Sequence, residues 1–323
     1  MRLGDIDLPS SIASVRNRPA TLLRVAAYHR RDYRLSVIWF SSREHLPIRA
    51  SIATSFGHAS SRGLSVLDRL PLELLCDVVL RLDMHSVFKL RQASFRARQI
   101  VDALKEYRMV VSHGLNLLCA LLRTRLAVAV SLSDFYSALC TESCALCDEF
   151  SGFISLPTWT RCCLGCLQKA PETQVRSLAG VRKRFRFTKA EVGSLQPFRT
   201  LPGIYTMDES AHKSRVTAVS LHQAMLLSGQ QAQEQGQTQS AADCERARKY
   251  NFMGSCALPY YDKRTGQVQH GARDKVYSRA GFLRHFRWCE HAQLLWRLSE
   301  DGTRRPAELP EAARRGGYFS PRE

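Results

Sequence analysis

The apolar and polar residues between positions 64 and 139 recur with the period of an α-helix. Pro71 suits the first turn of a helix, because the N–H group that proline lacks would have no intrahelical partner there. The apolar positions of this first helix lie three or four residues apart and form one face: Leu74, Leu75, Val78, Val79 and Leu82. Asp83 and Ser94 can cap a second and a third helix, since both side chains accept hydrogen bonds from free backbone N–H groups. The pattern therefore predicts three short helices in succession.

Two further helices are predicted before position 140. One begins at His113, and the next begins at a cap formed by Ser133–Asp134. Short helices with brief connections are typical of an all-α bundle. The most apolar stretch, Leu115 to Leu132, is interrupted by Arg123 and Arg125, each of which opposes membrane insertion by about 2.5–3.5 kcal/mol. We therefore expect a buried helix here and no membrane partner.

The helical pattern gives way after position 140 to a cluster of cysteines. Cys144 and Cys147 form one C-x2-C pair, and Cys163 and Cys166 form a second pair after fifteen intervening residues. A C-x2-C turn brings two thiolates to one side of a tetrahedral zinc ion, and the two pairs together complete its coordination. Four thiolates leave no open position for water. The spacing predicts one structural Zn²⁺ ion per chain.

Alternatives to these four ligands remain. Cys140 and Cys162 lie close by in the sequence, although neither preserves the C-x2-C spacing. The N-terminus shows no export signal, so metal binding is expected in preference to a disulfide framework. A cluster of free thiols is the other interpretation.

The charge of the chain is strongly positive. The formal net charge is +18, which favours an acidic partner such as nucleic acid. A basic run from Arg176 to Lys189 contains no acidic residue, and a capping box of Thr188 and Glu191 predicts that a helix begins at its end. The candidate phosphate contacts are Arg182, Lys183, Arg184 and Arg186. The alternative is an ordinary solvated face.

The remaining segments are defined mainly by composition. The first 63 residues are rich in arginine and serine and poor in acid, which predicts a disordered basic tail or, alternatively, a mitochondrial targeting segment. A helix is expected to open near Ser278. It carries His285 and Cys289 on one face, either packed against the core or as part of a second metal site. The expected division is 1–63 tail, 64–110 helical domain, 111–139 helical connector, 140–200 four-cysteine module with the basic run, 201–249 glutamine-rich linker, 250–300 aromatic-rich region and 301–323 flexible tail.

The stretch from Leu70 to Asp102 resembles the F-box, a helical module. The positions that carry the resemblance are Leu70, Pro71, Glu73, Leu74, Val78, Leu82, Asp83, Val87, Leu90, Arg91, Ser94 and Arg96. In that family the opening Leu-Pro and the apolar residues of the first two helices dock on the Skp-type adaptor of cullin–RING ubiquitin ligases. The resemblance therefore implies the adaptor-binding residues Leu70, Pro71, Leu74, Val78, Val87 and Leu90. One departure is Ala97, which stands where the family usually has an aromatic residue.

Two wider resemblances bear on function. Over positions 64–300 the chain resembles a group of fungal F-box proteins with a four-cysteine zinc segment. Those sequences carry a cysteine pair after the Tyr-Tyr-Asp segment, where this chain has QVQHGARDK. The zinc segment with its basic run and Thr-Lys-Ala-Glu tetrapeptide is similar to the zinc domain of the xeroderma-pigmentosum type of DNA-damage recognition proteins. This second resemblance implies contact with nucleic acid.

No enzymatic motif is evident. The sequence lacks a phosphate-binding glycine loop, an H-E-x-x-H signature and the H-x-E element that precedes the cysteines of zinc deaminases. The expected fold is mainly α, with an F-box-like helical bundle, a small zinc-stabilised α+β module and a C-terminal helical region.

The leading functional prediction is a non-catalytic substrate adaptor of a Skp–cullin–F-box ubiquitin ligase. It would act in the cytoplasm or nucleus, with its zinc and C-terminal parts binding an unknown protein target. A zinc-dependent nucleic-acid-binding protein that uses the basic run, residues 176–189, is the alternative. A RING-like ligase is disfavoured, because a RING needs two four-ligand sets and this sequence offers one.

Overall fold

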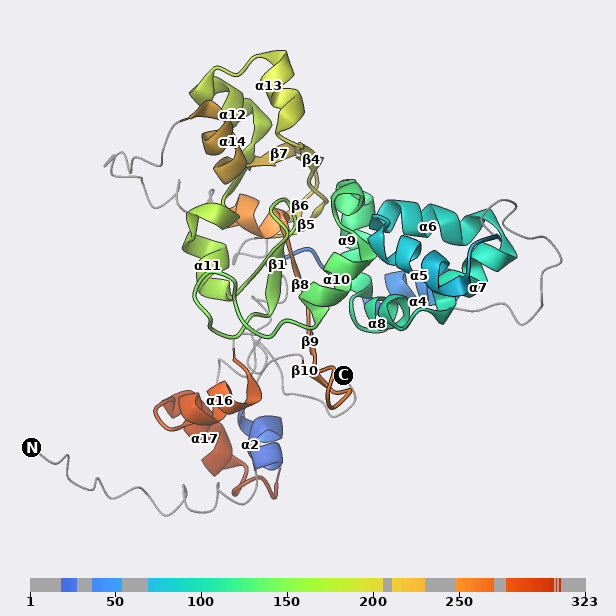
Figure 1. Ribbon diagram of the computed structural model, residues 1–323. Coiled ribbons are helices and arrows are strands. Elements are labelled where there is room, and N and C mark those ends of the chain that lie inside the picture. The colour runs from blue at the N-terminus through green and yellow to red at the C-terminus, as the bar shows by residue number, and fades with distance from the viewer. Residues whose placement is uncertain are drawn as a thin grey trace, which may run out of the picture. The chain divides into compact units, whose positions relative to one another are not determined.

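The computed structural model describes residues 19–27, 37–53, 69–205, 211–229, 248–269 and 277–304, with positions 306 and 308 (Figure 1). The chain forms two compact units, one from residues 35–268 and one from residues 1–34 with 269–323. Helices predominate, and a few short strands lie near the four cysteines. The predicted fold class is therefore confirmed. Among the described residues, no helix is both long enough and apolar enough to cross a membrane.

Six helices form the bundle of the larger unit: α5 (Leu72–Arg81), α6 (Met84–Ala93), α7 (Phe95–Ala103), α8 (Lys105–His113), α9 (Leu115–Thr124) and α10 (Leu132–Leu139). Asp83 caps α6 by accepting a hydrogen bond from the backbone N–H of Ser86, and Ser94 caps α7 by accepting one from Ala97. Both predicted caps are confirmed.

The last helices of the bundle begin at different residues from those predicted. The helix expected from His113 begins two residues later, as α9, because His113 is the last residue of a separate helix, α8, and Gly114 lies between the two. A side chain at Gly114 would lie 2.8 Å from the Phe135 ring, so the close approach of α10 requires glycine at this junction. Helix α10 is capped by Ser131, which forms a capping box with Asp134, and not by Ser133.

The N-terminal segment contributes a helix to this bundle. Helix α4 (Ser42–Ala53) packs against α8. Arg91 Nη1 donates a hydrogen bond to the carbonyl of Ser51 at 2.7 Å, and the Tyr107 hydroxyl donates one to the carbonyl of Ile52 at 3.3 Å. The prediction of a disordered tail is wrong for these residues, because composition does not reveal partners distant in sequence. Much of the predicted tail lies outside the described residues.

A three-stranded antiparallel sheet lies beside the cysteines. Its central strand β1 (Phe153–Ser155) pairs with β2 (Thr160–Cys162) and with β8 (Ser255–Ala257). Ile38 adds an isolated parallel bridge to Cys256. Residues assigned by composition to separate segments therefore share one sheet.

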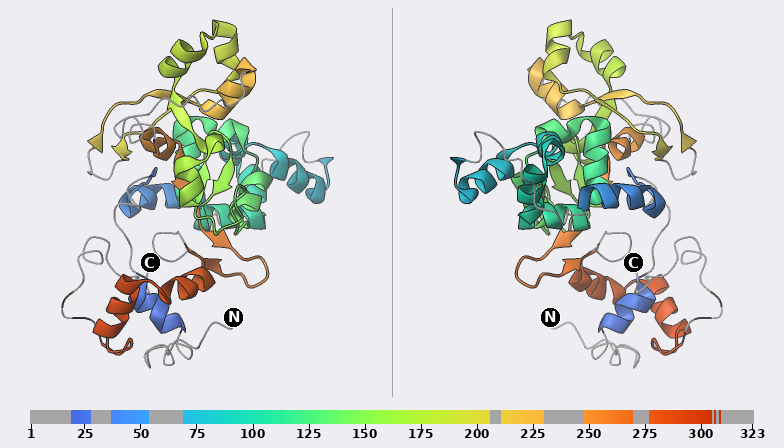
Figure 2. Two further views of the ribbon diagram at one scale, coloured as in Figure 1. Left: turned by 90° about the vertical axis from the view of Figure 1, so that its left-hand side faces the viewer. Right: turned by 90° about the vertical axis from the view of Figure 1, so that its right-hand side faces the viewer.

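A second sheet follows the cysteines, in the order β3 (Val175–Ser177), β7 (Thr217–Ser220) and β4 (Phe198–Arg199). Helices α12 (Leu178–Phe185), α13 (Lys189–Ser194) and α14 (Leu221–Ser228) group with it (Figures 1 and 2). Their shared core consists of Val181, Phe187, Leu195, Val219, Leu221 and Ala224. The linker prediction is thus wrong for 211–229, whose strand β7 is central to this sheet, while the glutamine-rich stretch 230–239 lies outside the described residues.

Short hairpins complete this unit. Strand β5 (Gly203–Ile204) pairs with β6 (Ala211–His212), and β9 (Tyr260–Tyr261) pairs with β10 (Val268–Gln269). Helix α11 (Leu164–Lys169) follows β2 directly and carries the second cysteine pair at its start.

In the smaller unit a helix from the N-terminal part of the sequence packs against two helices from the C-terminal part. Helix α2 (Pro19–Ala26) packs against α16 (Arg279–Phe286) and α17 (Glu290–Leu298), and the three lie side by side in Figure 1. Leu22, Phe282 and Trp296 are buried between them. The predicted start at Ser278 is confirmed, since its hydroxyl accepts a hydrogen bond from the N–H of Gly281. The single predicted helix is instead two helices, and Cys289 is the N-cap residue of the second.

Candidate functional site

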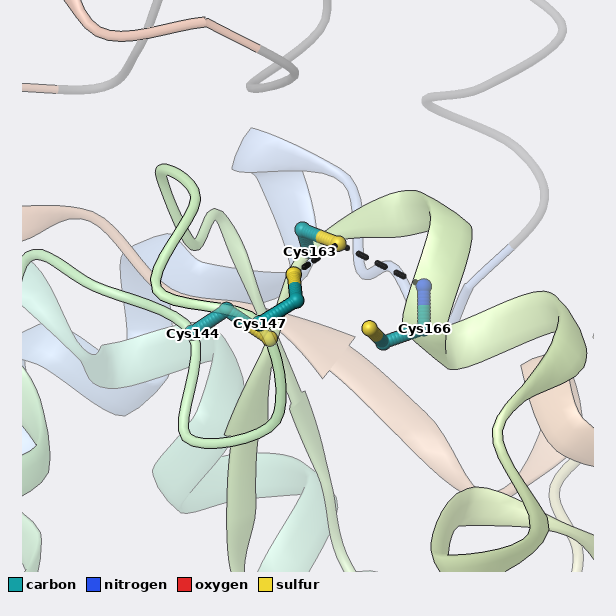
Figure 3. A group of neighbouring side chains, drawn as sticks. All are labelled: Cys144, Cys147, Cys163 and Cys166. Carbon is teal, nitrogen blue, oxygen red and sulfur yellow. Dashed lines mark hydrogen bonds between the residues drawn. The ribbon is translucent and has the colours of Figure 1, made fainter.

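The four predicted zinc ligands come together from two adjacent segments (Figure 3). Cys144 and Cys147 lie in the turn after α10, which closes with a hydrogen bond from the N–H of Asp148 to the carbonyl of Cys144. Cys163 is the N-cap residue of α11, and Cys166 lies in the first turn of this helix. The sequence folds in this way because a C-x2-C turn and a helix start both direct two side chains to one side.

The geometry of the four sulfur atoms fits a tetrahedral metal ion. All four Sγ atoms lie within 4.8 Å of one another, and those of Cys147 and Cys163 are 3.6 Å apart. Zn–S bonds of about 2.3 Å in a tetrahedron require S–S separations of about 3.8 Å. Backbone N–H groups of Leu146 and Cys166 donate hydrogen bonds to Cys144 Sγ and Cys163 Sγ, which orients these sulfur atoms. The cluster can therefore bind a metal ion.

The thiols of the cluster differ in acidity. Burial opposes ionisation of Cys144, but hydrogen bonds from the backbone N–H groups of Cys163 and Leu146 outweigh it and lower its pKa. Burial and the neighbouring thiols raise the pKa of Cys166, and burial likewise raises that of Cys163. A bound metal ion needs all four as thiolates, so metal binding releases protons.

The two other nearby cysteines do not join the cluster. Cys162 points into the core from β2 and is fully buried, which raises the pKa of its thiol. Cys140 ends α10, and burial raises the pKa of its thiol as well. The choice of ligands made from the C-x2-C spacing therefore agrees with the positions of the side chains.

Arg161, on strand β2, connects the cysteine turn to its surroundings. Its side chain is 4% exposed and donates hydrogen bonds to the carbonyl groups of Ala138 (2.7 Å), Ser151 (2.9 Å), Leu258 (3.1 Å) and Pro259 (3.1 Å). Burial lowers the pKa of this guanidinium to about 10. One side chain thus joins the end of α10, the cysteine turn and the end of β8. The sequence offered no signal for this role in a chain so rich in arginine.

Two of the six predicted adaptor-binding residues lie on the exposed face of α5, and two more lie exposed just before this helix. Leu70, Leu74 and Val78 are 38%, 52% and 45% exposed. Leu74 and Val78 lie four residues apart and therefore share one stripe of the α5 surface, while Leu70 lies just before the helix begins. Leu72 and Phe95, which the sequence analysis did not include, are 52% and 51% exposed. We name the exposed apolar residues of α5 and of the two positions before it the α5 patch: Leu70, Pro71, Leu72, Leu74 and Val78.

Comparison with protein families identifies this part of the chain. Residues 67–109, which run from just before α5 into α8, match the F-box domain. The chain carries an F-box. No curated protein and no solved structure matches the chain. The resemblance to the F-box is thus confirmed for this segment, and the α5 patch lies within it.

Two residues predicted to contact the Skp-type adaptor are less exposed in the structure than expected. Val87 is fully buried, so its inclusion among the surface residues is wrong. It lies on the inner face of α6, which the helical period alone did not distinguish from the outer face. Leu90 is half-buried. Ala97, where the family usually has an aromatic residue, is 1% exposed, so a small residue here fills the core and leaves the α5 patch unchanged.

The basic run is exposed at the other sheet of the same unit. The four candidate cations all face solvent: Arg182, Lys183, Arg184 and Arg186. The predicted capping box is confirmed, since Thr188 and Glu191 form both of its hydrogen bonds. These cations are distant in sequence from the α5 patch and belong to different elements.

The second metal site considered from sequence is not assembled in the described residues. His285 is buried between the rings of Tyr277 and Trp288, at centroid distances of 4.5 and 4.1 Å. Cys289 belongs to the core of the smaller unit. Among the described residues, only the cluster at Cys144 gathers three or more metal-binding groups. His270, a further histidine upstream of α16, lies outside the described residues.

A cysteine–histidine pair that the sequence did not reveal lies between α4 and α9. Cys119 Sγ is 4.0 Å from His45 Nδ1, and His45 Nε2 is 3.3 Å from Asn116 Oδ1. Burial raises the pKa of the Cys119 thiol and lowers that of His45, so both are held neutral. Asn116 also donates hydrogen bonds to Ile38 and Cys256. The buried thiol has no access to a substrate, and the group stabilises the packing of α4 on α9.

Proposed function

We propose that this protein is a substrate-recognition subunit of a Skp–cullin–F-box ubiquitin ligase, with its α5 patch docked on the Skp-type adaptor. An F-box is consistent with such a role, and F-box proteins are generally non-catalytic adaptors. The single observation that carries the proposal is the α5 patch within the matched segment. A soluble chain rarely leaves a row of large apolar side chains exposed unless it forms an interface.

We further propose that the four cysteines hold a structural Zn²⁺ ion. Four sulfur donors at tetrahedral spacing favour zinc over the harder cations, which prefer oxygen ligands. The ion would hold the cysteine turn against the start of α11, and Arg161 would connect this centre to α10 of the helical bundle. Its role would thus be to hold the cysteine turn, α11 and the end of α10 together within the larger unit.

The elements outside the F-box are the proposed site for the target protein. They include the two sheets of the larger unit and the three helices of the smaller unit. A target held there would be presented for ubiquitin transfer and degradation, in the cytoplasm or nucleus.

Affinity capture tests the proposal directly. The tagged full chain is expected to retain a Skp-type adaptor and a cullin from cell extract. A Leu74→Glu/Val78→Glu variant should lose both, because two carboxylates would be buried against an apolar partner surface. A matched control, Leu226→Glu/Leu227→Glu, replaces exposed leucines on α14 and should retain both proteins. Capture of neither protein by the parent chain would refute the proposal.

A further inference from the structure

In the basic run four cationic side chains face solvent, while the apolar side chains on either side of them are buried. Arg182, Lys183 and Arg184 form the last turn of α12, and Arg186 follows it in the left-handed conformation, at φ 54°. All four are exposed, whereas Val181 and Phe187 of the same segment are buried in the core. The core thus fixes the backbone of this segment while its cations remain available to a partner.

The four cations have no acidic partner among the residues that the structure describes. None of them forms an ion pair with a carboxylate in the part of the chain that the structure describes. The nearest acid in sequence, Glu191, is engaged in the capping box, where its Oε2 accepts hydrogen bonds from the Thr188 N–H and hydroxyl at 2.7 Å. Uncompensated charges of one sign create a local field that attracts an anionic ligand.

Further exposed cations come from the neighbouring strands. Arg199 of β4 pairs in register with Thr217 of β7, and Lys213 and Arg215 lie just before β7. In the described residues of 171–205 and 211–229, the only acidic residues are Glu172 and Glu191. This part of the larger unit is therefore basic on several elements, as a surface that follows a polyanion would be.

An aromatic pair lies within the same segment. The rings of Phe185 and Phe187 stack at a centroid distance of 5.4 Å and an interplanar angle of 20°, and the Arg184 guanidinium lies 5.2 Å from the Phe185 ring centre. Guanidinium groups bind phosphate oxygens with two parallel hydrogen bonds. The half-buried Phe185, stacked on Phe187, holds one of these guanidinium groups in place.

We propose that Arg182, Lys183, Arg184 and Arg186 bind the phosphate backbone of nucleic acid without sequence preference. An anionic membrane fits the surface less well. No large apolar side chain of residues 171–205 is strongly exposed, and the exposed leucines of the same fold, Leu226 and Leu227, lie on α14 and not on the basic run. The α5 patch is not part of this site. A protein docked on the ligase through that patch could therefore bind nucleic acid, or a target protein carried on nucleic acid, at the same time.

The salt dependence of binding by the full chain tests the inference. For four phosphate contacts, the slope of log K against log salt is expected to be about −2.8 on single strands and about −3.6 on duplex. Raising salt from 50 to 200 mM should then weaken binding by about 50-fold and about 150-fold respectively. The probes are mixed-sequence DNA single strands and duplexes of about 30 nucleotides, long enough to cover several contacts.

Two variants with equal loss of charge separate a local site from general attraction. Arg182→Gln/Lys183→Gln/Arg184→Gln/Arg186→Gln should bind much more weakly and with a flattened slope. The control Arg81→Gln/Lys89→Gln/Arg96→Gln/Lys105→Gln changes exposed cations of the F-box helices and should keep most of the parent slope. A melting temperature and a metal content equal to those of the parent verify folding. If the fourfold variant misfolds, Arg182→Gln/Arg186→Gln should show about half of the loss in slope.

Three results would overturn the inference. The first is that the parent fails to bind either DNA form at 50 mM salt, and the second is that both fourfold variants lose DNA affinity equally. The third is that the parent binds phosphatidylserine vesicles and does not bind DNA. Adaptor capture by the same variants is measured separately. The inference does not rest on the ligase proposal, so either can fail while the other stands.

Discussion

The carboxylate of Asp102 accepts two hydrogen bonds from the guanidinium of Arg91, at 2.7 Å from Nε and 3.2 Å from Nη2. Arg91 is 3% exposed, so the pair lies almost wholly out of water. It joins α6 to α7 within the F-box, and a third bond from Arg91 reaches Ser51 of α4. The F-box therefore includes in its packing a helix that lies well before the matched segment.

Removing the carboxylate should destabilise this unit strongly. Asp102→Ala is expected to lower the free energy of unfolding by about 3–5 kcal/mol, because it leaves a buried guanidinium without its partner. Asp77→Ala, an exposed position on α5, should stay within about 0.5 kcal/mol of the parent. Urea unfolding measures both. Equal values for the two variants would show that the pair contributes nothing specific.

Arg161 is expected to be as critical for the cysteine turn. Arg161→Met removes the donor that four carbonyl groups share. Ala138 keeps a backbone hydrogen bond from the N–H of Thr141, but each of the other buried acceptors left unsatisfied costs about 1–3 kcal/mol. We expect a loss of at least about 3 kcal/mol in the free energy of unfolding, with less metal retained. Arg108→Met, at an exposed position on α8, is the matched control and should change neither quantity. Retention of full stability by Arg161→Met would refute this role.

Metal content distinguishes the four cysteines from their neighbours. Elemental analysis of the purified chain should find one zinc per chain, and Cys163→Ser should reduce it to less than half and expose the segment to protease. Cys140→Ser and Cys162→Ser should keep the metal, because neither thiol lies in the cluster. Less than half an equivalent in the parent, purified without chelator, would contradict the assignment.

The buried imidazole of His45 should make stability fall in acid. Burial lowers its pKa below the usual 6.5, so the unfolded chain binds a proton more readily than the folded chain. Stability is then full above about pH 6.5 and declines as the pH falls below that value. His45→Gln should reduce the difference between urea midpoints at about pH 7 and about pH 5.5. An unchanged difference would show that His45 does not contribute to it.

Local sequence patterns were enough to predict the helical bundle and the grouping of the four cysteines. The caps at Asp83, Ser94 and Thr188 depend on bonds within four residues, and the C-x2-C pairs depend on a single turn. Contacts between distant segments were not accessible in this way. Ser255–Ala257 joins the sheet of Phe153–Ser155 across about a hundred residues, and composition gave no sign of it. Val87 shows the same limit. The helical period correctly predicted a helix at this position, but it did not show that the Val87 side chain faces the core and not the surface.

The binding of a purified Skp-type adaptor to the full chain tests the central claim most directly. The account predicts that the parent binds and that Leu74→Glu/Val78→Glu weakens binding by at least about 30-fold, the cost of losing a hot spot, with an unchanged melting temperature. Val101→Ala, at a fully buried position in α7, should lose roughly 1–2 kcal/mol of stability and bind like the parent. Failure of the parent to bind, or equal binding by the parent and the Leu74→Glu/Val78→Glu variant, would contradict the claim that the α5 patch is the adaptor-binding surface.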